Sequence, residues 1–103
     1  MAQTSTVVLE KTKTKTTLRK KYKVIMYNDQ KTSFECVIDI LVNVFNKTEQ
    51  QAFQIALAIH QSGPTGSKVI GEYSKTIAEA KRDKALRMAK EAGYPDFKVE
   101  VKE

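Results

Sequence analysis

The sequence predicts a single small α+β domain with a three-stranded antiparallel sheet and three helices, in the order β-α-α-β-α-β, behind a flexible N-terminal tail. Apolar residues alternate in short segments, as in strands, and recur at helical spacing in longer ones. A length of 103 residues allows one hydrophobic core but not two. No segment repeats another, so a small sheet with helices on one face would bury all the apolar residues.

Residues 1–21 are predicted to be a flexible basic tail, and residues 22–103 the folded domain. Lys and Thr alternate from Lys11 to Thr16, which leaves too little apolar surface to offset the entropy cost of ordering. Of the formal net charge of +6, the tail contributes +5, from six basic side chains against one glutamate. The remaining +1 makes the domain nearly neutral, which argues against a nucleic-acid-binding face.

Residues 22–27 are predicted to form the first strand. Their apolar side chains point to both faces, as in a strand covered on both sides, and an Asn-Asp pair ends the segment. A first helix is predicted over residues 33–46, because apolar residues recur there at helical spacing. Thr32 and Glu35 have the spacing of a capping box at its start.

A second helix begins after Thr48, which forms another capping box with Gln51, and extends to His60. Glycine, proline and serine between residues 62 and 67 then break the helix and predict a mobile loop.

The second half of the domain is predicted as strand, helix and strand. Residues 69–73 form the second strand, and Ser74 or Thr76 caps a long third helix that a Gly-Tyr-Pro segment ends. Alternation over residues 97–101 predicts a half-buried last strand. The apolar face of the third helix is expected to consist of Ile77, Ala80, Leu86 and Met88 or their neighbours.

The composition predicts a cytoplasmic protein without metal or cofactor. Cys36 is the single cysteine, so neither an intrachain disulfide nor zinc-ligand spacing is present. No apolar run is long enough for a membrane span or a signal peptide. The Thr- and Lys-rich, acid-poor start weakly resembles an organelle transit peptide, which leaves a plastid location as the alternative.

The sequence is expected to belong to a protein that is not an enzyme. Its glycines lack the spacing of a P-loop or a dinucleotide-binding turn. A Cys36/His60 dyad is the one pairing of a nucleophile with a base, but Cys36 lies near the start of a helix between Glu35 and Val37. Catalysis by this dyad is kept as an alternative.

Three polar residues end apolar elements: Asn28 and Asp29 end the first strand, and His60 ends the second helix. Each has an ordinary explanation, because Asn and Asp favour turns and His favours helix C-termini. If the two elements are neighbours, however, these residues form a polar rim over an apolar cavity. That arrangement suits a ligand with a cationic head and an apolar body, such as a free protein N-terminus that begins with Phe, Tyr, Trp or Leu.

These residues lie in segments that resemble the ClpS adaptors, which recognise N-degrons and deliver them to the ClpA-type AAA+ unfoldase of the ClpAP protease. The similarity runs from about residue 22 to 101 and is carried by four segments in the family's order. They are Tyr-Lys-Val-Ile-Met-Tyr-Asn-Asp (22–29), Phe-Glu-Cys-Val-Ile-Asp-Ile-Leu (34–41), Ala-Leu-Ala-Ile-His (56–60) and residues 71–81.

The resemblance implies a role for each matching position. Asn28, Asp29 and His60 would receive the substrate α-ammonium group, and Lys81 would contact the unfoldase. The tail would be the extension that the unfoldase pore engages during delivery, and the adaptor would act as a monomer. The hydrophobic pocket for the first side chain would be lined by Thr32, Phe34, Val37, Leu41, Ala56 and Ile59.

The sequence departs from the usual ClpS pattern near the implied pocket. Gln30 replaces a common acidic residue, Ser33 a common proline, and Phe34 and Ala56 replace two methionines. Thr76 stands where an acidic partner-facing residue is common, and the loop after the second helix is longer. The smaller Ala56 deepens one wall while Phe34 stiffens another, so we expect a preference for large aromatic first residues.

A ribosome- or RNA-associated module is the alternative from another functional class. The C-terminal domain of the ribosomal stalk protein has a similar small α/β shape, and the tail is basic. The nearly neutral domain and the lack of an aromatic strand motif for base stacking argue against this alternative.

Overall fold

The computed structural model describes residues 20–103. Its elements are β1 (Tyr22–Tyr27), α2 (Phe34–Asn43), α3 (Glu49–Gln61), β2 (Ser67–Tyr73), α4 (Lys75–Glu91) and β3 (Val99–Lys102). The predicted α+β fold, with three helices and a three-stranded antiparallel sheet, is confirmed. The tail predicted over residues 1–21 lies outside the described residues, apart from its last two positions.

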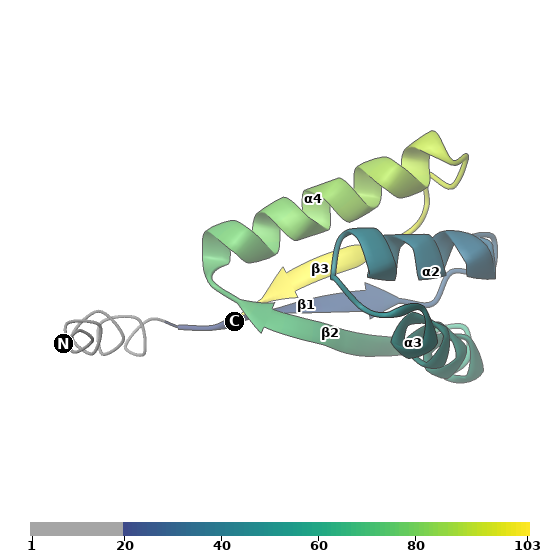
Figure 1. The fold of residues 1–103 in the computed structure, drawn as a ribbon, viewed down its shortest axis with the longest axis horizontal. Coiled ribbons are helices and arrows are strands. Elements are labelled where there is room, and N and C mark those ends of the chain that lie inside the picture. The colour runs from purple at the N-terminus through teal and green to yellow at the C-terminus, as the bar shows by residue number, and fades with distance from the viewer. Residues whose placement is uncertain (1–19) are drawn as a thin grey trace, which may run out of the picture.

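Strand β1 is the centre of the sheet, whose strand order is β2-β1-β3 with antiparallel neighbours on both sides (Figure 1). On β3, Val101 lies opposite Val24 and Val99 opposite Met26. Both β1 side chains are fully buried, with 0% exposure. On the opposite face of β1, Ile25 and Tyr27 are only partly buried and Lys23 is exposed. Of the two faces predicted to be covered, the helices therefore cover only the face of Val24 and Met26, and the other face stays partly exposed.

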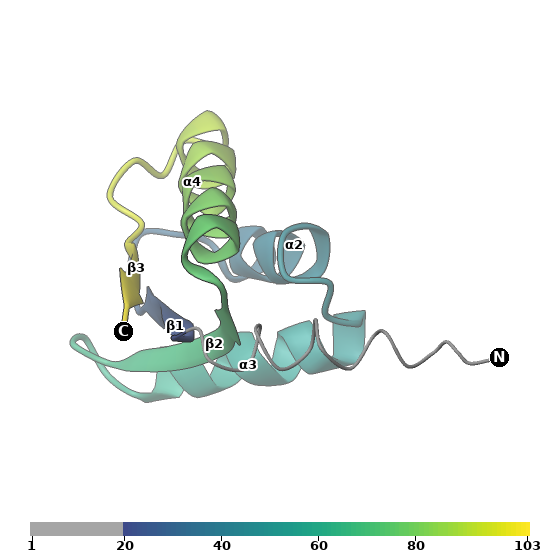
Figure 2. The same ribbon diagram turned by 90° about the vertical axis from the view of Figure 1, so that its left-hand side faces the viewer.

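The helices α2 and α4 lie on one side of the sheet (Figure 1), and α3 packs against α2 beside the edge strand β2 (Figure 2). The core between these layers contains Ile40 and Leu41 of α2, both with 0% exposure, and the inward residues of β1. Burial of each such side chain stabilises the fold by about 1.5–3 kcal/mol. The end of β1 and the end of α3 both lie near the start of α2.

The capping box of α3 is confirmed: Thr48 Oγ1 accepts from the Gln51 backbone amide at 3.1 Å, and the Gln51 side chain accepts from the Thr48 amide at 3.0 Å. The predicted box at the start of α2 is wrong. Ser33 is the N-cap and accepts from the Cys36 amide at 3.1 Å. Thr32, one residue earlier, donates its hydroxyl to the Asp29 side chain in the turn before the helix, which leaves Ser33 to cap the helix.

Helix α4 is capped by Ser74, one of the two predicted residues. Its buried face consists of Ala78, Ala85 and Ala89, all with 0% exposure, whereas Ile77 is 48% exposed. The predicted face is therefore displaced to neighbouring positions, because small side chains let the helix approach the core closely. Among residues 20–103, none of the helices combines the length and apolar character that a membrane crossing requires.

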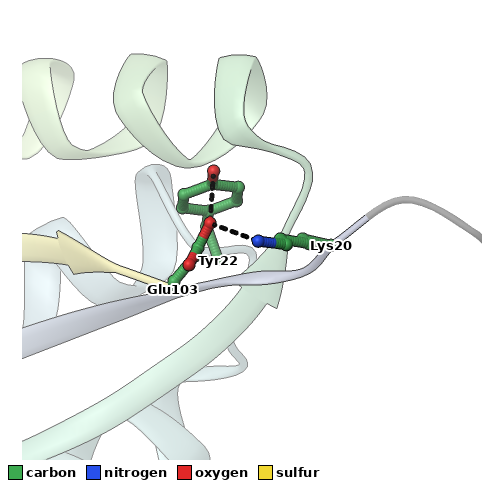
Figure 3. A network of polar contacts seen from close by, with 3 residues as sticks. All are labelled: Lys20, Tyr22 and Glu103. Atoms are coloured by element: carbon green, nitrogen blue, oxygen red, sulfur yellow. Dashed lines mark hydrogen bonds and ion pairs between the residues drawn. The ribbon is translucent and has the colours of Figure 1, made fainter.

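The two ends of the described chain meet where β1 begins and β3 ends (Figure 3). The side-chain carboxylate of Glu103 accepts a hydrogen bond from Lys20 Nζ and another from the Tyr22 hydroxyl, each at 3.2 Å. Lys20 and Glu103 are mostly exposed, so this ion pair stabilises the domain only weakly.

Candidate functional site

A cavity of ≈ 340 Å³ lies where the end of β1, the start of α2 and the end of α3 meet. The apolar part of its wall comes from all three elements, and the buried Phe97 before β3 adds a fourth segment. Its lining comprises Met26, Tyr27, Asn28, Asp29, Gln30, Lys31, Thr32, Ser33, Phe34, Val37, Ala56, Ile59, His60 and Phe97. The fold thus brings residues from distant parts of the sequence to one apolar hollow with polar groups beside it.

The carboxylate of Asp29 is held by the turn that follows β1. The hydroxyl of Thr32 donates a hydrogen bond to Asp29 Oδ2, and the Thr32 backbone amide donates to the Asp29 carbonyl at 3.2 Å. Thr32 is only 8% exposed, so its hydroxyl is shielded from competing water. No basic side chain among residues 20–103 forms an ion pair with Asp29. Asp29 therefore places at the cavity an oriented carboxylate that has no ion-pair partner within the described domain.

The side chain of Asn28 is fixed by the loop after α3. Its Nδ2 donates to the Gly63 carbonyl at 2.7 Å, and its backbone amide donates to the Gly66 carbonyl at 2.9 Å. No described residue donates a hydrogen bond to Asn28 Oδ1. This oxygen is therefore available as an acceptor in the cavity.

His60 lies in the last turn of α3, is exposed and lines the cavity. Within the described domain, no group forms a hydrogen bond with its imidazole ring, so the ring is free to meet a ligand. The three predicted receptor residues, Asn28, Asp29 and His60, all line the same cavity.

The apolar walls come mainly from α2 and α3. Phe34 contacts Phe53 edge to face, with ring centroids 5.4 Å apart, and this contact braces the α2 side. Ala56 and Ile59 form the α3 side and are 3% and 4% exposed. Five of the six predicted pocket residues line the cavity: Thr32, Phe34, Val37, Ala56 and Ile59.

The sixth predicted pocket residue, Leu41, does not line the cavity. It is fully buried in the core, two helical turns beyond Phe34. Sequence reasoning also missed Met26 and Phe97. Met26 could have been found, since it lies two residues before Asn28 on the same face of β1. Nothing in the local sequence marks Phe97, which reaches the cavity only through the tertiary fold.

Lys81, the predicted partner contact, lies away from the cavity. Its Nζ donates to the Val44 carbonyl at the end of α2 at 2.8 Å, and lies 5.2 Å from the Tyr73 ring centroid and 5.9 Å from that of Phe45. The side chain is partly buried. Lys81 therefore stabilises the C-terminus of α2.

The alternative Cys36/His60 dyad finds no support in the site. Cys36 is buried and does not line the cavity, whereas His60 does. Burial and the nearby negative charge of Asp39 raise the pKa of the Cys36 thiol, which disfavours the nucleophilic thiolate. In residues 20–103, no cluster of His, Cys, Asp and Glu side chains could hold a metal ion.

Comparison with known proteins gives a consistent result. A family model described as "ATP-dependent Clp protease adaptor protein ClpS" matches residues 17–97. The ATP-dependent Clp protease adapter protein ClpS of Nautilia profundicola is 42% identical over 76 residues, which are 74% of this chain and 75% of that protein. The corresponding protein of Campylobacter jejuni is 40% identical over 82 residues, which are 80% of this chain and 82% of that protein.

A solved structure, described as Agrobacterium tumefaciens ClpS2 bound to L-phenylalaninamide, has the same fold with a TM-score of 0.70. It is 34% identical and covers 81% of this chain and 98% of its own. The family model covers most of the sequence, and the similar proteins span most of the folded domain. The chain therefore belongs to the ClpS family of ATP-dependent Clp protease adaptor proteins.

Proposed function

We propose that this adaptor binds the free α-amino group and the bulky hydrophobic first side chain of N-degron proteins and delivers them to the ClpA-type AAA+ unfoldase of the Clp protease. The observation that carries the proposal is that Asn28, Asp29 and His60 line one cavity together with apolar walls. A cationic N-terminus attached to a hydrophobic side chain complements both parts of this cavity.

The α-ammonium group has three N–H donors, and the site offers three types of acceptor. Asp29 supplies a carboxylate oriented by Thr32, Asn28 supplies an amide oxygen, and His60 supplies a ring nitrogen. Hydrogen bonds to a charged group contribute about 1.5–3 kcal/mol each. An acetylated N-terminus has no charge and only one N–H, so most of the binding free energy from these hydrogen bonds should be absent.

The first side chain of the substrate would enter between α2 and α3. Burying one Phe or Leu side chain contributes about 1.5–3 kcal/mol, so this term alone gives no useful affinity without the hydrogen bonds to the ammonium. L-phenylalaninamide, the ligand named for the Agrobacterium tumefaciens structure, combines a free amine with a benzyl side chain. Its chemistry supports the same class of ligand here.

We propose Phe, Tyr, Trp and Leu as the accepted first residues, with the large aromatic ones preferred. Ala56 leaves space on the α3 wall, while Phe34 is held by its contact with Phe53 and offers an aromatic face or edge to a substrate ring. Leu would fill less of this space and leave a gap beside Ala56, which lowers its affinity.

Delivery would use surfaces outside the cavity. Lys81 is proposed to contact the unfoldase, because its side chain is only partly buried and lies beside the exposed Ile77. Residues 1–21 would form the extension engaged by the unfoldase, and residues 22–103 the adaptor domain. The protein would act as a cytoplasmic monomer, bind neither nucleic acid nor membrane, and catalyse no reaction itself.

Fluorescence anisotropy with labelled peptides tests the proposal. The full chain should bind a peptide that begins with Phe, and acetylation of the same N-terminus should abolish binding. Equal affinity for the free and acetylated peptides would refute the proposal. Competition by L-phenylalaninamide would show that the first residue alone accounts for the interaction.

A further inference from the structure

The four residues Gly63–Gly66 form a turn that is bound closely to the end of β1. The Gly66 amide donates to the Gly63 carbonyl at 3.0 Å and closes the turn, while Ser62 is joined to α3 through its amide, which donates to the Ile59 carbonyl at 3.1 Å. The two glycine carbonyls then accept from the side chain and the backbone amide of Asn28, at 2.7 and 2.9 Å.

The contact with Gly63 fixes which way the Asn28 amide faces. A carbonyl oxygen only accepts hydrogen bonds, so the Asn28 atom next to it must be the NH₂ nitrogen. The Oδ1 atom then points to the other side of the planar amide. Asn28 lines the cavity and Gly63 does not, so the contact leaves the acceptor oxygen on the cavity side.

We infer that the Gly63–Gly66 turn is a positioning element that sets the Asn28 amide to accept a hydrogen bond from a cationic ligand. The inference rests on the proposed function. It assigns a role in ligand binding to residues 63–66, which do not line the cavity. If the turn moved, the amide could rotate and present its NH₂ group to the ammonium. Two donors would then face each other, which weakens binding without changing the apolar pocket.

The backbone of the turn requires its two glycines. Gly63 has a φ of +91°, which other residues adopt only with strain, although open space surrounds the position of a Cβ. A Cβ on Gly66 would overlap the Ser62 side chain and backbone. Alanine at either position should therefore displace the carbonyls that hold Asn28.

Gly93, after α4, provides a matched control. Its φ is +98°, and a Cβ there also meets open space, so alanine imposes a similar backbone strain in a turn that forms no hydrogen bond with Asn28. We expect Gly63→Ala to weaken binding of L-phenylalaninamide by about tenfold, measured by calorimetry on the full chain. Gly93→Ala should bind like the wild type while losing similar thermal stability.

A double-mutant cycle separates positioning from general damage to the fold. In an Asn28→Ala background, Gly63→Ala should cause no further loss of affinity, because the side chain it positions is absent. Gly66→Ala gives a second variant, which should also weaken binding through Asn28. The inference is overturned if Gly63→Ala and Gly66→Ala bind like Gly93→Ala, or if their losses persist without Asn28. If the wild type itself fails to bind, the proposed function fails, and the inference with it.

Discussion

The hydroxyl of Thr32 donates a hydrogen bond to the carboxylate of Asp29, and the same residue's amide donates to the Asp29 carbonyl. Thr32 was predicted to cap α2, but it instead orients the negative charge at the cavity, and Ser33 caps the helix. The hydrogen bond costs little entropy, because the turn already places both residues together. Asp29 is thus held in position before a ligand arrives.

Thr32→Val should weaken ligand binding more than it weakens the fold. Valine keeps the shape but removes the hydroxyl, so the carboxylate is free to rotate. We expect L-phenylalaninamide to bind about three- to tenfold more weakly, by calorimetry. Thr76→Val, at an exposed position on α4, is the control and should bind like the wild type. Equal affinities for both variants would show that the Thr32 hydroxyl does not contribute.

Ala56→Met should narrow the cavity and change the order of preferred first residues. The longer side chain fills the space that we assign to a large aromatic ring, at a cost in stability of about 1–3 kcal/mol if the wall cannot adjust. On a peptide array, binding of Trp- and Phe-starting peptides should fall further than that of Leu-starting ones. A wild-type array that ranks Leu well above Phe and Trp would contradict the assignment.

Local interactions explain which features could be predicted from the sequence. The capping box at Thr48 and Gln51 lies within four residues, and the apolar run over residues 24–27 indicates a strand, although not which of its faces is buried. The polar residues Asn28, Asp29 and His60 were also recognisable, because each follows or ends an apolar segment of the sequence. The short alternating and periodic segments were enough to predict the fold class.

Features that depend on a choice between competing contacts, or on contacts between residues distant in sequence, could not be predicted in this way. Thr32 and Ser33 were both able to cap α2, and the contact with Asp29 decided between them. Phe97 reaches the cavity from a segment that is distant in sequence. The contact between Gly63 and Asn28 spans 35 residues and has no local signal. The loop was predicted as a mobile break between elements, without this contact.

Lys81→Ala should affect stability and delivery but not ligand binding. The lysine satisfies the Val44 carbonyl at the end of α2, so its loss should lower the free energy of unfolding by about 1 kcal/mol. Affinity for L-phenylalaninamide should be unchanged, while degradation of a Phe-starting substrate by the unfoldase and protease should slow. Lys84→Ala, one turn along α4 and exposed, should leave stability unchanged. If the substrate is degraded as fast with Lys81→Ala as with the wild type, Lys81 does not contact the unfoldase.

Glu100 lies on the outer face of the sheet, and it should make the stability of the folded domain depend on pH. The hydrogen bond from the Tyr27 hydroxyl at 2.7 Å, followed by the interaction with Lys98, lowers the pKa of Glu100. A lowered folded-state pKa stabilises the fold above the unfolded value, about 4.3, and this contribution disappears as the pH falls through the folded value.

Glu100→Gln should therefore lower the melting temperature at pH 7, and its difference from the wild type should shrink toward pH 3. Glu72→Gln is the control, because Glu72 is exposed and forms no ion pair within the described domain. A difference for Glu100→Gln that stays constant from pH 7 to pH 3 would contradict this assignment.

Amide chemical-shift mapping of the ¹⁵N-labelled full chain with L-phenylalaninamide and its N-acetyl derivative tests the central claim most directly. The free amine should shift the signals of Asn28, Asp29, Phe34, Ala56 and His60 and leave that of Lys81 in place, whereas the acetylated compound should cause no comparable shifts. Identical shifts with both compounds, or shifts confined to residues away from the cavity, would contradict the account.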